Sequence, residues 1–165
     1  MGVENAPVIT FTDPRRFGFM DLLTPRQLAV HPALSALGAE PLSEAFTAAS
    51  LAAAFAGKKT SLKAALLVQR VVAGLGNIYA VEALHRAGLS PLRRASTIAT
   101  PAGRPRPAAE RLSAAIKEVL REAVARKNER GSRGQRFRVY DREEERCLTR
   151  GCGGAVERRP QTGRS

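Results

Sequence analysis

The chain has 165 residues, a formal net charge of +12 and a sequence pI of about 11.1. This length suffices for one domain or two small ones, and so basic a balance favours a polyanionic partner. With no Trp and few aromatic residues, the chain is unsuited to binding single strands on aromatic platforms. No apolar run approaches membrane-spanning length and the N-terminus lacks the features of a secretion signal, so we expect a cytoplasmic protein without a membrane partner.

The N-terminal part is expected to contain two short strands and the start of a helix. Residues 8–11 (Val-Ile-Thr-Phe) and 17–20 (Phe-Gly-Phe-Met) carry the β-branched and aromatic side chains typical of strands. The Asp-Pro pair at 13–14 supplies the turn between them. Thr24 followed by Pro25 predicts a helix N-terminus, with the threonine as cap and the proline at the first helical position.

Three helices are predicted in the middle of the chain. An alanine-rich helix covers 43–55, and a second helix begins at residues 60–61 (Thr-Ser) and runs into a glycine turn. The turn is residues 73–77 (Ala-Gly-Leu-Gly-Asn), and a third helix follows over 78–87. The first and third helices each end at a glycine, which favours helix termination. These glycines are Gly57 and Gly88.

The C-terminal part is expected to contain a linker, a long helix and a basic stretch. Residues 91–107 are punctuated by prolines and predict the linker, and Pro107 then begins the helix. Residues 126–138 have no apolar period and predict a connector or a backbone-binding arm, and 136–140 are compatible with a strand. One face of the long helix is apolar. Its members are Leu112, Ile116, Val119, Leu120, Ala123 and Val124.

The glycine turn is the most informative feature of the chain. Gly74 and Gly76 allow positive φ or the close approach of a partner, and Asn77 can cap the helix that begins there. A helix N-terminus offers amide donors and a positive dipole end, which suit a phosphate. In so basic a chain that phosphate is expected to belong to a nucleic acid.

Two other interpretations of this turn are open. It can be a plain helix–turn–helix corner without a ligand. Residues 74–80 also fit the G-x-G-x-x-A pattern of dinucleotide-binding proteins, which needs a strand before it and an acidic residue about 20 positions later. The preceding residues are good helix formers, and no Asp or Glu lies between Glu82 and Glu110, so the dinucleotide interpretation is disfavoured.

Three stretches, residues 13–18 (Asp-Pro-Arg-Arg-Phe-Gly), 63–88 and 147–165, together resemble the bacterial formamidopyrimidine-DNA glycosylase family and occur in that family's order. The stretch Gly-Leu-Gly-Asn-Ile-Tyr-Ala looks like its helix–two-turns–helix motif. The resemblance covers essentially all of this chain, but only the latter part of the family's length.

The resemblance implies a mainly α fold in three parts. A helix–two-turns–helix DNA-binding domain is expected over 24–127. A remnant of an N-terminal β-sandwich is expected before it, over 1–23, and a basic linker with an incomplete zinc finger after it, over 128–165.

The function implied by resemblance is base-excision repair of DNA. Family members excise oxidised purines, such as formamidopyrimidine and 8-oxoguanine, and cleave the resulting abasic site. The expected partner is damaged or abasic double-stranded DNA, bound by a monomer at the bacterial nucleoid. A non-enzymatic basic DNA- or RNA-binding module is the alternative.

The sequence departs from the family where the family's nucleophile stands. The nucleophile is the amine of a proline in an initial Pro-Glu, but position 2 here is Gly, and the chain ends at Ser165, before a second cysteine pair. We therefore expect a truncated member that binds DNA without efficient catalysis, and we predict no catalytic residue.

The resemblance also implies which residues contact DNA. Asn77 would bind the backbone around the lesion, and Lys63 a phosphate near it. Arg15 would pair with the base left behind when its partner flips out, with Phe17 wedged beside it. A surface arginine pair and a core phenylalanine are the alternative. The full set is Asn77, Lys63, Arg15, Arg16, Phe17, Gly74, Gly76 and Arg164, the last of which would grip the phosphates of the flipped nucleotide.

Cys147 and Cys152 are the predicted metal ligands, with the resemblance implying zinc. Zinc in structural sites takes four ligands. His31 and His85 fall in predicted helical regions far back in the chain and are expected to be a surface residue and a helix-face residue. The cysteines would then form only a half-site, with weak or absent binding. Glu82 is expected to be an exposed carboxylate and a poor candidate for a general acid.

Overall fold

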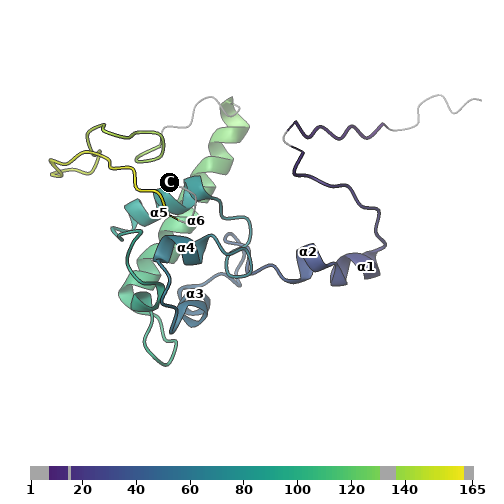
Figure 1. Cartoon of the computed structure of the whole chain (residues 1–165), viewed down its shortest axis with the longest axis horizontal. Coiled ribbons are helices and arrows are strands. Elements are labelled where there is room, and N and C mark those ends of the chain that lie inside the picture. Colours follow the sequence, from purple (N-terminus) through teal and green to yellow (C-terminus); the bar gives the residue numbers. More distant parts are fainter. Residues whose placement is uncertain (1–7, 15, 131–136, 162–165) are drawn as a thin grey trace, which may run out of the picture. The chain divides into compact units, whose positions relative to one another are not determined.

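The computed structural model describes residues 8–14, 16–130 and 137–161, with the side chains of 127–130 excepted. Its elements run in the order α1, α2, α3, α4, α5, η1, α6 (Figure 1). Within the described residues all regular elements are helices, and the remaining pairings are isolated β-bridges. The prediction of a mainly α fold is confirmed. The chain divides into two compact units, Met1–Ser35 and Ala36–Ser165, called here the N-terminal unit and the helical unit.

The N-terminal unit contains two short helices, α1 (Pro25–Val30) and α2 (Pro32–Ser35), neither of which has a buried residue. The start of α1 is as predicted. Thr24 accepts from the Gln27 backbone N–H, the Gln27 side chain accepts from the Thr24 N–H, and Pro25 occupies the first turn. This reciprocal capping box needs only residues within one turn, so it forms without tertiary support.

The predicted strands at 8–11 and 17–20 do not form. Both segments lack regular structure, and their apolar side chains face solvent, with Val8 87% and Phe17 81% exposed. A pair of strands on its own is marginal in water and needs a further strand or a helix to cover its apolar face. Strand propensity alone therefore does not produce pairing here.

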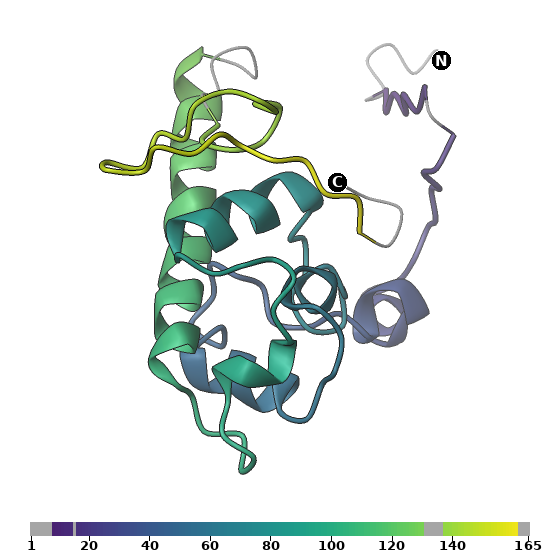
Figure 2. The ribbon, with the colours of Figure 1, turned by 60° about the vertical axis from the view of Figure 1, so that its left-hand side comes forward.

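The helical unit is built along α6 (Pro107–Arg130), which contacts α5 (Asn77–Arg86), α3 (Ala48–Phe55) and the 3₁₀ helix η1 (Ala95–Ile98). In Figure 2, α6 runs along one side of this unit and the other helices stack against it. The short α4 (Leu62–Leu66) contacts α5 and η1. The largest fully buried side chains come from all of these segments. They are Phe46, Phe55, Leu51, Leu62, Leu66, Leu75, Leu84, Ile98, Leu112, Ile116 and Val72.

The helix α3 starts later than predicted, at Ala48 rather than residue 43. Thr47 is its cap, because its side chain accepts from the Ser50 N–H while the Ser50 side chain accepts from the Thr47 N–H. The end of α3 agrees with the sequence, since Gly57 follows the last turn with a φ of +70°. Gly88 ends α5 in the same way, with a φ of +65°.

The stretch 91–107 is part of the core and not a linker. It contains η1, and Ala95 and Ile98 are fully buried. Backbone bonds also attach it to α4, with the Leu62 N–H donating to the Arg93 carbonyl at 2.7 Å. The prolines interrupt the periodicity by which buried segments are usually recognised, although the small apolar residues between them still pack.

The long helix has the predicted start and most of the predicted apolar face. Leu112, Ile116 and Val119 are buried, whereas Val124 is 53% exposed. The helix continues to Arg130, so the first part of the stretch predicted to be a connector is helical. Residues 137–140 form a bend and turn instead of a strand. No helix within the described ranges is both long and apolar enough to cross a membrane.

The last described segment, residues 137–161, is called here the tail. It folds back on itself around the bridge between Arg146 and Ala155. The Cys147 N–H donates to the Gly154 carbonyl at 2.9 Å, which closes the loop that contains both cysteines. A cavity of about 590 Å³ separates the tail from α5 and residues 89–92.

Candidate nucleic-acid interface

The glycine turn brings the chain from α4 into α5. Gly74 has a φ of +71°, which a glycine adopts at no steric cost, and Leu75 is fully buried and anchors the turn. Gly76, and not Asn77, is the N-cap of α5, and it makes no side-chain cap bond. The expectation that Asn77 caps the helix is therefore wrong, because Asn77 is already the first helical residue.

Lys63 lies in α4 and is only 2% exposed. It lines the cavity between α5 and the tail. The helix that carries it begins at Ser61, whose side chain accepts from the Ala64 N–H. Lys63 is thus a buried cation at the wall of a cavity and not a solvated helix lysine.

The tail reaches the same helix end. The Ser61 hydroxyl donates to Gln161 Oε1 at 3.1 Å, across 100 positions of sequence. Gln161 also lines the cavity with Lys63. The family-like stretch that begins at Gln161 therefore starts beside α4, while Arg164 itself lies outside the described residues.

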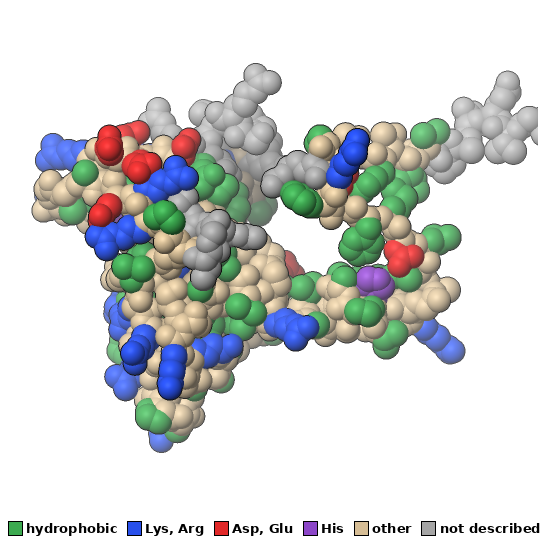
Figure 3. Space-filling model, in the orientation of Figure 1, with side chains coloured by type: hydrophobic (Ala, Val, Ile, Leu, Met, Phe, Trp, Pro, Cys, Tyr) green, Lys and Arg blue, Asp and Glu red, His purple; other side chains and the backbone are tan. Residues whose placement is uncertain are grey.

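Acidic side chains gather on the tail. Asp141, Glu143, Glu144 and Glu145 are all exposed, and red side chains cluster over the tail in Figure 3. Blue Lys and Arg side chains are spread over the helices on the same face. A carboxylate cluster repels phosphate, so the glycine turn and α4 are better placed than residues 141–145 to meet a polyanion.

In the N-terminal unit, residues 13–18 form a compact turn. The Gly18 N–H donates to Asp13 Oδ2 at 2.6 Å, and Arg16 adopts a positive φ of 55°. A Cβ at Gly18 would lie 2.9 Å from the Phe11 ring, so this approach requires glycine. Arg16 and Phe17 are exposed, which excludes the core phenylalanine considered above. Arg15 lies outside the described residues.

Cys147 contacts α5 through His85, a neighbour that the sequence did not predict. Cys147 Sγ lies 3.7 Å from His85 Nε2, which in turn lies 3.2 Å from Thr149 Oγ1. Hydrogen bonds from Thr149, followed by the one with His85, lower the pKa of Cys147 from 9.0 to about 6.

These residues do not form a zinc site. Among the residues that the structure describes, no three His, Cys, Asp or Glu side chains are grouped closely enough to hold a metal ion. The donor types suit zinc, but His85 Nδ1 is buried without a hydrogen-bond partner, whereas metal-bound histidines usually donate from the second nitrogen.

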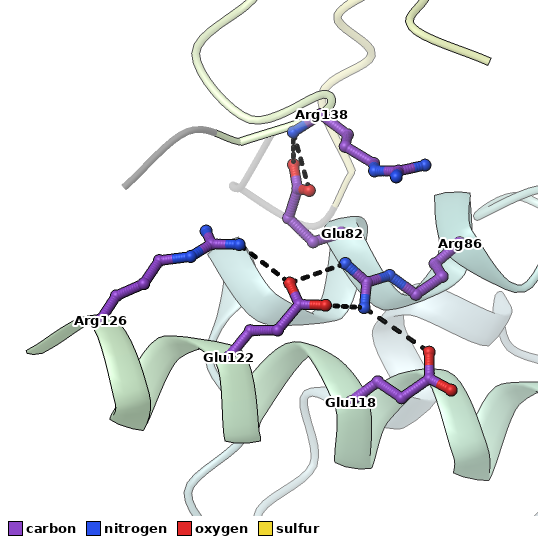
Figure 4. A network of polar contacts seen from close by, with 6 residues as sticks. All are labelled: Glu82, Arg86, Glu118, Glu122, Arg126 and Arg138. Carbon is purple, nitrogen blue, oxygen red and sulfur yellow. Dashed lines mark hydrogen bonds and ion pairs between the residues drawn. The ribbon is translucent and has the colours of Figure 1, made fainter. Parts of the chain in front are cut away.

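Glu82 holds the tail against α5 and is buried, contrary to the expectation of an exposed carboxylate. Its side chain is 5% exposed. It accepts from the backbone N–H groups of Arg138, Val139 and Tyr140 at 2.8–3.1 Å (Figure 4). All the described acceptor bonds are to backbone amides, so Glu82 positions the tail.

A second ion-pair network joins α5 to α6. Arg86 donates to both carboxylate oxygens of Glu122, at 2.6 and 2.9 Å, and Arg126 donates to the same carboxylate (Figure 4). Glu118 lies 3.5 Å from Arg86. The bond from Arg86 is the main cause that lowers the pKa of Glu122, and the same bond raises that of Arg86.

The helical unit matches a known domain. Residues 37–134 match the family model described as the formamidopyrimidine-DNA glycosylase H2TH domain. The chain is 54% identical to the formamidopyrimidine-DNA glycosylase of Afipia carboxidovorans over 99% of its own length and 59% of the relative's. It is 55% identical to that of Azorhizobium caulinodans, over 95% of this chain and 57% of the relative. It thus spans about three fifths of these relatives.

Solved structures give the same result. The MutM (Fpg) protein of Thermus thermophilus is 36% identical, with a TM-score of 0.68, over 92% of this chain and 59% of that one. MutM in complex with DNA containing carbocyclic 8-oxo-G is 28% identical, with a TM-score of 0.78, over 92% and 56%. The helical fold, the glycine turn at the start of α5 and these matches agree: the chain belongs to the formamidopyrimidine-DNA glycosylase family.

Proposed function

We propose that this chain binds damaged or abasic double-stranded DNA in base-excision repair, with the glycine turn and α5 contacting the phosphate backbone. The observation that carries the proposal is the start of α5. Its cap is a glycine without a side-chain cap bond, so the first amides face outward without a capping side chain. The net charge of +12 supplies the long-range attraction to a polyanion.

The residues fall into two proposed roles. Gly76, Asn77 and Lys63 would hold phosphates, whereas Gly74 supplies the positive φ of the turn. Arg16 and Phe17, together with Arg15, would fill the gap left by a flipped nucleotide, since a guanidinium and an aromatic ring both stack on bases. Arg164 would hold the phosphates of that nucleotide. Excision and strand cleavage belong to the family, and we assign no catalytic residue to the described part of this chain.

Zinc remains a proposed and weak ligand. Cys147 and Cys152 would form half of a site, consistent with the absence of a third suitable side chain beside them in the described residues. Purified protein should carry less than one zinc per chain, and a chelator should remove it. One tightly held zinc per monomer in elemental analysis would show that further ligands exist.

The test of DNA binding is the Asn77→Ala variant. We expect its affinity for a duplex with an abasic-site analogue to fall by about 1–3 kcal/mol, the scale of a lost bond to a charged group. Fluorescence anisotropy over a salt titration measures both the affinity and the number of phosphates neutralised. A thermal melt of the variant controls for folding. Unchanged affinity would remove the glycine turn from the interface, and tighter binding to duplex RNA would favour an RNA-binding protein.

A further inference from the structure

The loop from α4 to α5, residues 67–76, is held together by one side chain. Gln69 Oε1 accepts from the Gly74 N–H at 2.7 Å, and Gln69 Nε2 donates to the Leu75 carbonyl at 3.2 Å and to the Leu67 carbonyl at 3.3 Å. A single amide therefore joins the beginning of the loop to the glycine turn at its end.

The backbone of the same loop is fixed from its other side by residues 38 and 39. The Gly38 N–H donates to the Gln69 carbonyl at 2.8 Å, and the Ala73 N–H donates to the Ala39 carbonyl at 3.1 Å. A Cβ at Gly38 would lie 2.4 Å from the Val71 carbonyl oxygen, so this contact requires glycine. The backbone position of Gln69 is thus fixed, and its amide is directed onto the turn.

The bond to Gly74 changes the role of that residue. Since its N–H already donates to Gln69, Gly74 is not the turn's phosphate donor. Its bond instead holds the backbone at the positive φ that sets the direction of Gly76 and the start of α5. Small errors in the position of a contacting group cost much of an interaction, so a fixed turn favours the contact.

We infer that Gln69 is a positioning residue for the DNA-phosphate contact at the glycine turn, acting through Gly74 and Leu75. This inference rests on the function proposed above. Gln69 is exposed, whereas Leu75 is fully buried and anchors the turn to the core independently. Removal of the Gln69 amide should therefore loosen the turn locally while leaving the core packed.

The experiment compares Gln69→Met, which keeps the length of the side chain and removes its hydrogen bonds, with a matched control in the full-length chain. The control is Gln27→Met, because Gln27 is also an exposed glutamine whose amide bonds to a backbone N–H, but at α1. The probe is a duplex with an abasic-site analogue. The readouts are affinity across a salt titration, hydrogen exchange of the Gly74 amide, and the urea midpoint.

For Gln69→Met we expect exchange at Gly74 to speed up at least about tenfold and DNA affinity to fall about tenfold. The slope of log affinity against log salt should become shallower by about one phosphate, with a urea midpoint near that of the native chain. The control should leave DNA affinity unchanged. If Gln69 acts through the turn, Gln69→Met should weaken an Asn77→Ala background less than about twofold, because coupled residues are not additive.

Each other outcome is decisive. An unchanged affinity in Gln69→Met, alongside a weakened Asn77→Ala, overturns the positioning role and leaves the proposed function standing. A full further tenfold loss in the double variant, or a Gln69→Met chain that fails to fold, makes Gln69 a general stabilising residue. If Asn77→Ala binds normally while Gly74 exchange is still accelerated in Gln69→Met, the proposed function fails and the inference fails with it.

Discussion

The two units of this chain show what local sequence can and cannot build. Both begin a helix with a capping box, at Thr24 in the N-terminal unit and at Thr47 in the helical unit. After the first box, neither α1 nor α2 has a buried residue, whereas α3 buries Leu51 and Phe55. Caps need only the next few residues, but a core needs a partner, and only the helical unit supplies one.

The largest expected difference between the units is in the cost of losing a phenylalanine. Phe55→Ala, at a fully buried position, should destabilise the helical unit by about 3–5 kcal/mol. Phe17→Ala, at a side chain that is 81% exposed, should change the free energy of unfolding by less than about 0.5 kcal/mol. Urea denaturation followed by circular dichroism measures both. Equal costs would mean that the N-terminal unit is packed after all.

The tail is intermediate between the two units, because it has little core of its own and depends on Glu82. Glu82→Gln leaves one acceptor oxygen for three backbone amides and should cost about 1.5–3 kcal/mol. Hydrogen exchange at residues 138–140 should rise with it. Glu44→Gln, at an exposed glutamate in a turn, is the control and should change neither quantity. Normal protection of those amides in Glu82→Gln would contradict the role given to Glu82.

The features that could be predicted from sequence are those set by neighbours in the chain. The cap at Thr24, the glycines after α3 and α5, and the start of α6 at Pro107 all follow from local conformational preferences. The role of the glycine turn followed from its glycines and from the basic charge of the chain.

The missed features depend on residues far apart in sequence. The contact of Cys147 with His85 spans 62 positions, and the bonds of Glu82 to the tail span 56 to 58. Helical periodicity identifies the face of α5 that enters the core, but not what covers its other face. The cap residue of α5 was misplaced by one position because both Gly76 and Asn77 are acceptable caps.

A smaller and pH-dependent effect is expected from the Arg86–Glu122 pair. The pKa of Glu122 is lowered in the folded chain, so its stabilisation is fully present above the unfolded value and is lost as pH falls through the folded value. The Glu122 side chain is 42% exposed, which screens the pair and limits its worth to roughly 1 kcal/mol. The native chain should therefore be more stable than Glu122→Gln at pH 7, and the two should converge below about pH 4. A difference that persists at pH 3 would assign the effect to packing.

The smallest expected change in stability comes from the largest change in sequence, removal of residues 1–23. The described residues before Thr24 expose their apolar side chains, among them Val8, Ile9 and Leu22, which are 84–97% exposed. Such a surface adds little to the free energy of unfolding but promotes association between chains. The shortened chain should melt within a few degrees of the full chain and stay monomeric at higher concentration, as measured by light scattering. A charged replacement, Ile9→Lys with Leu22→Lys, should improve solubility in the same direction without shortening the chain. If the deletion instead lowers both solubility and melting temperature, these residues cover part of the helical core, and the contrast between the two units disappears.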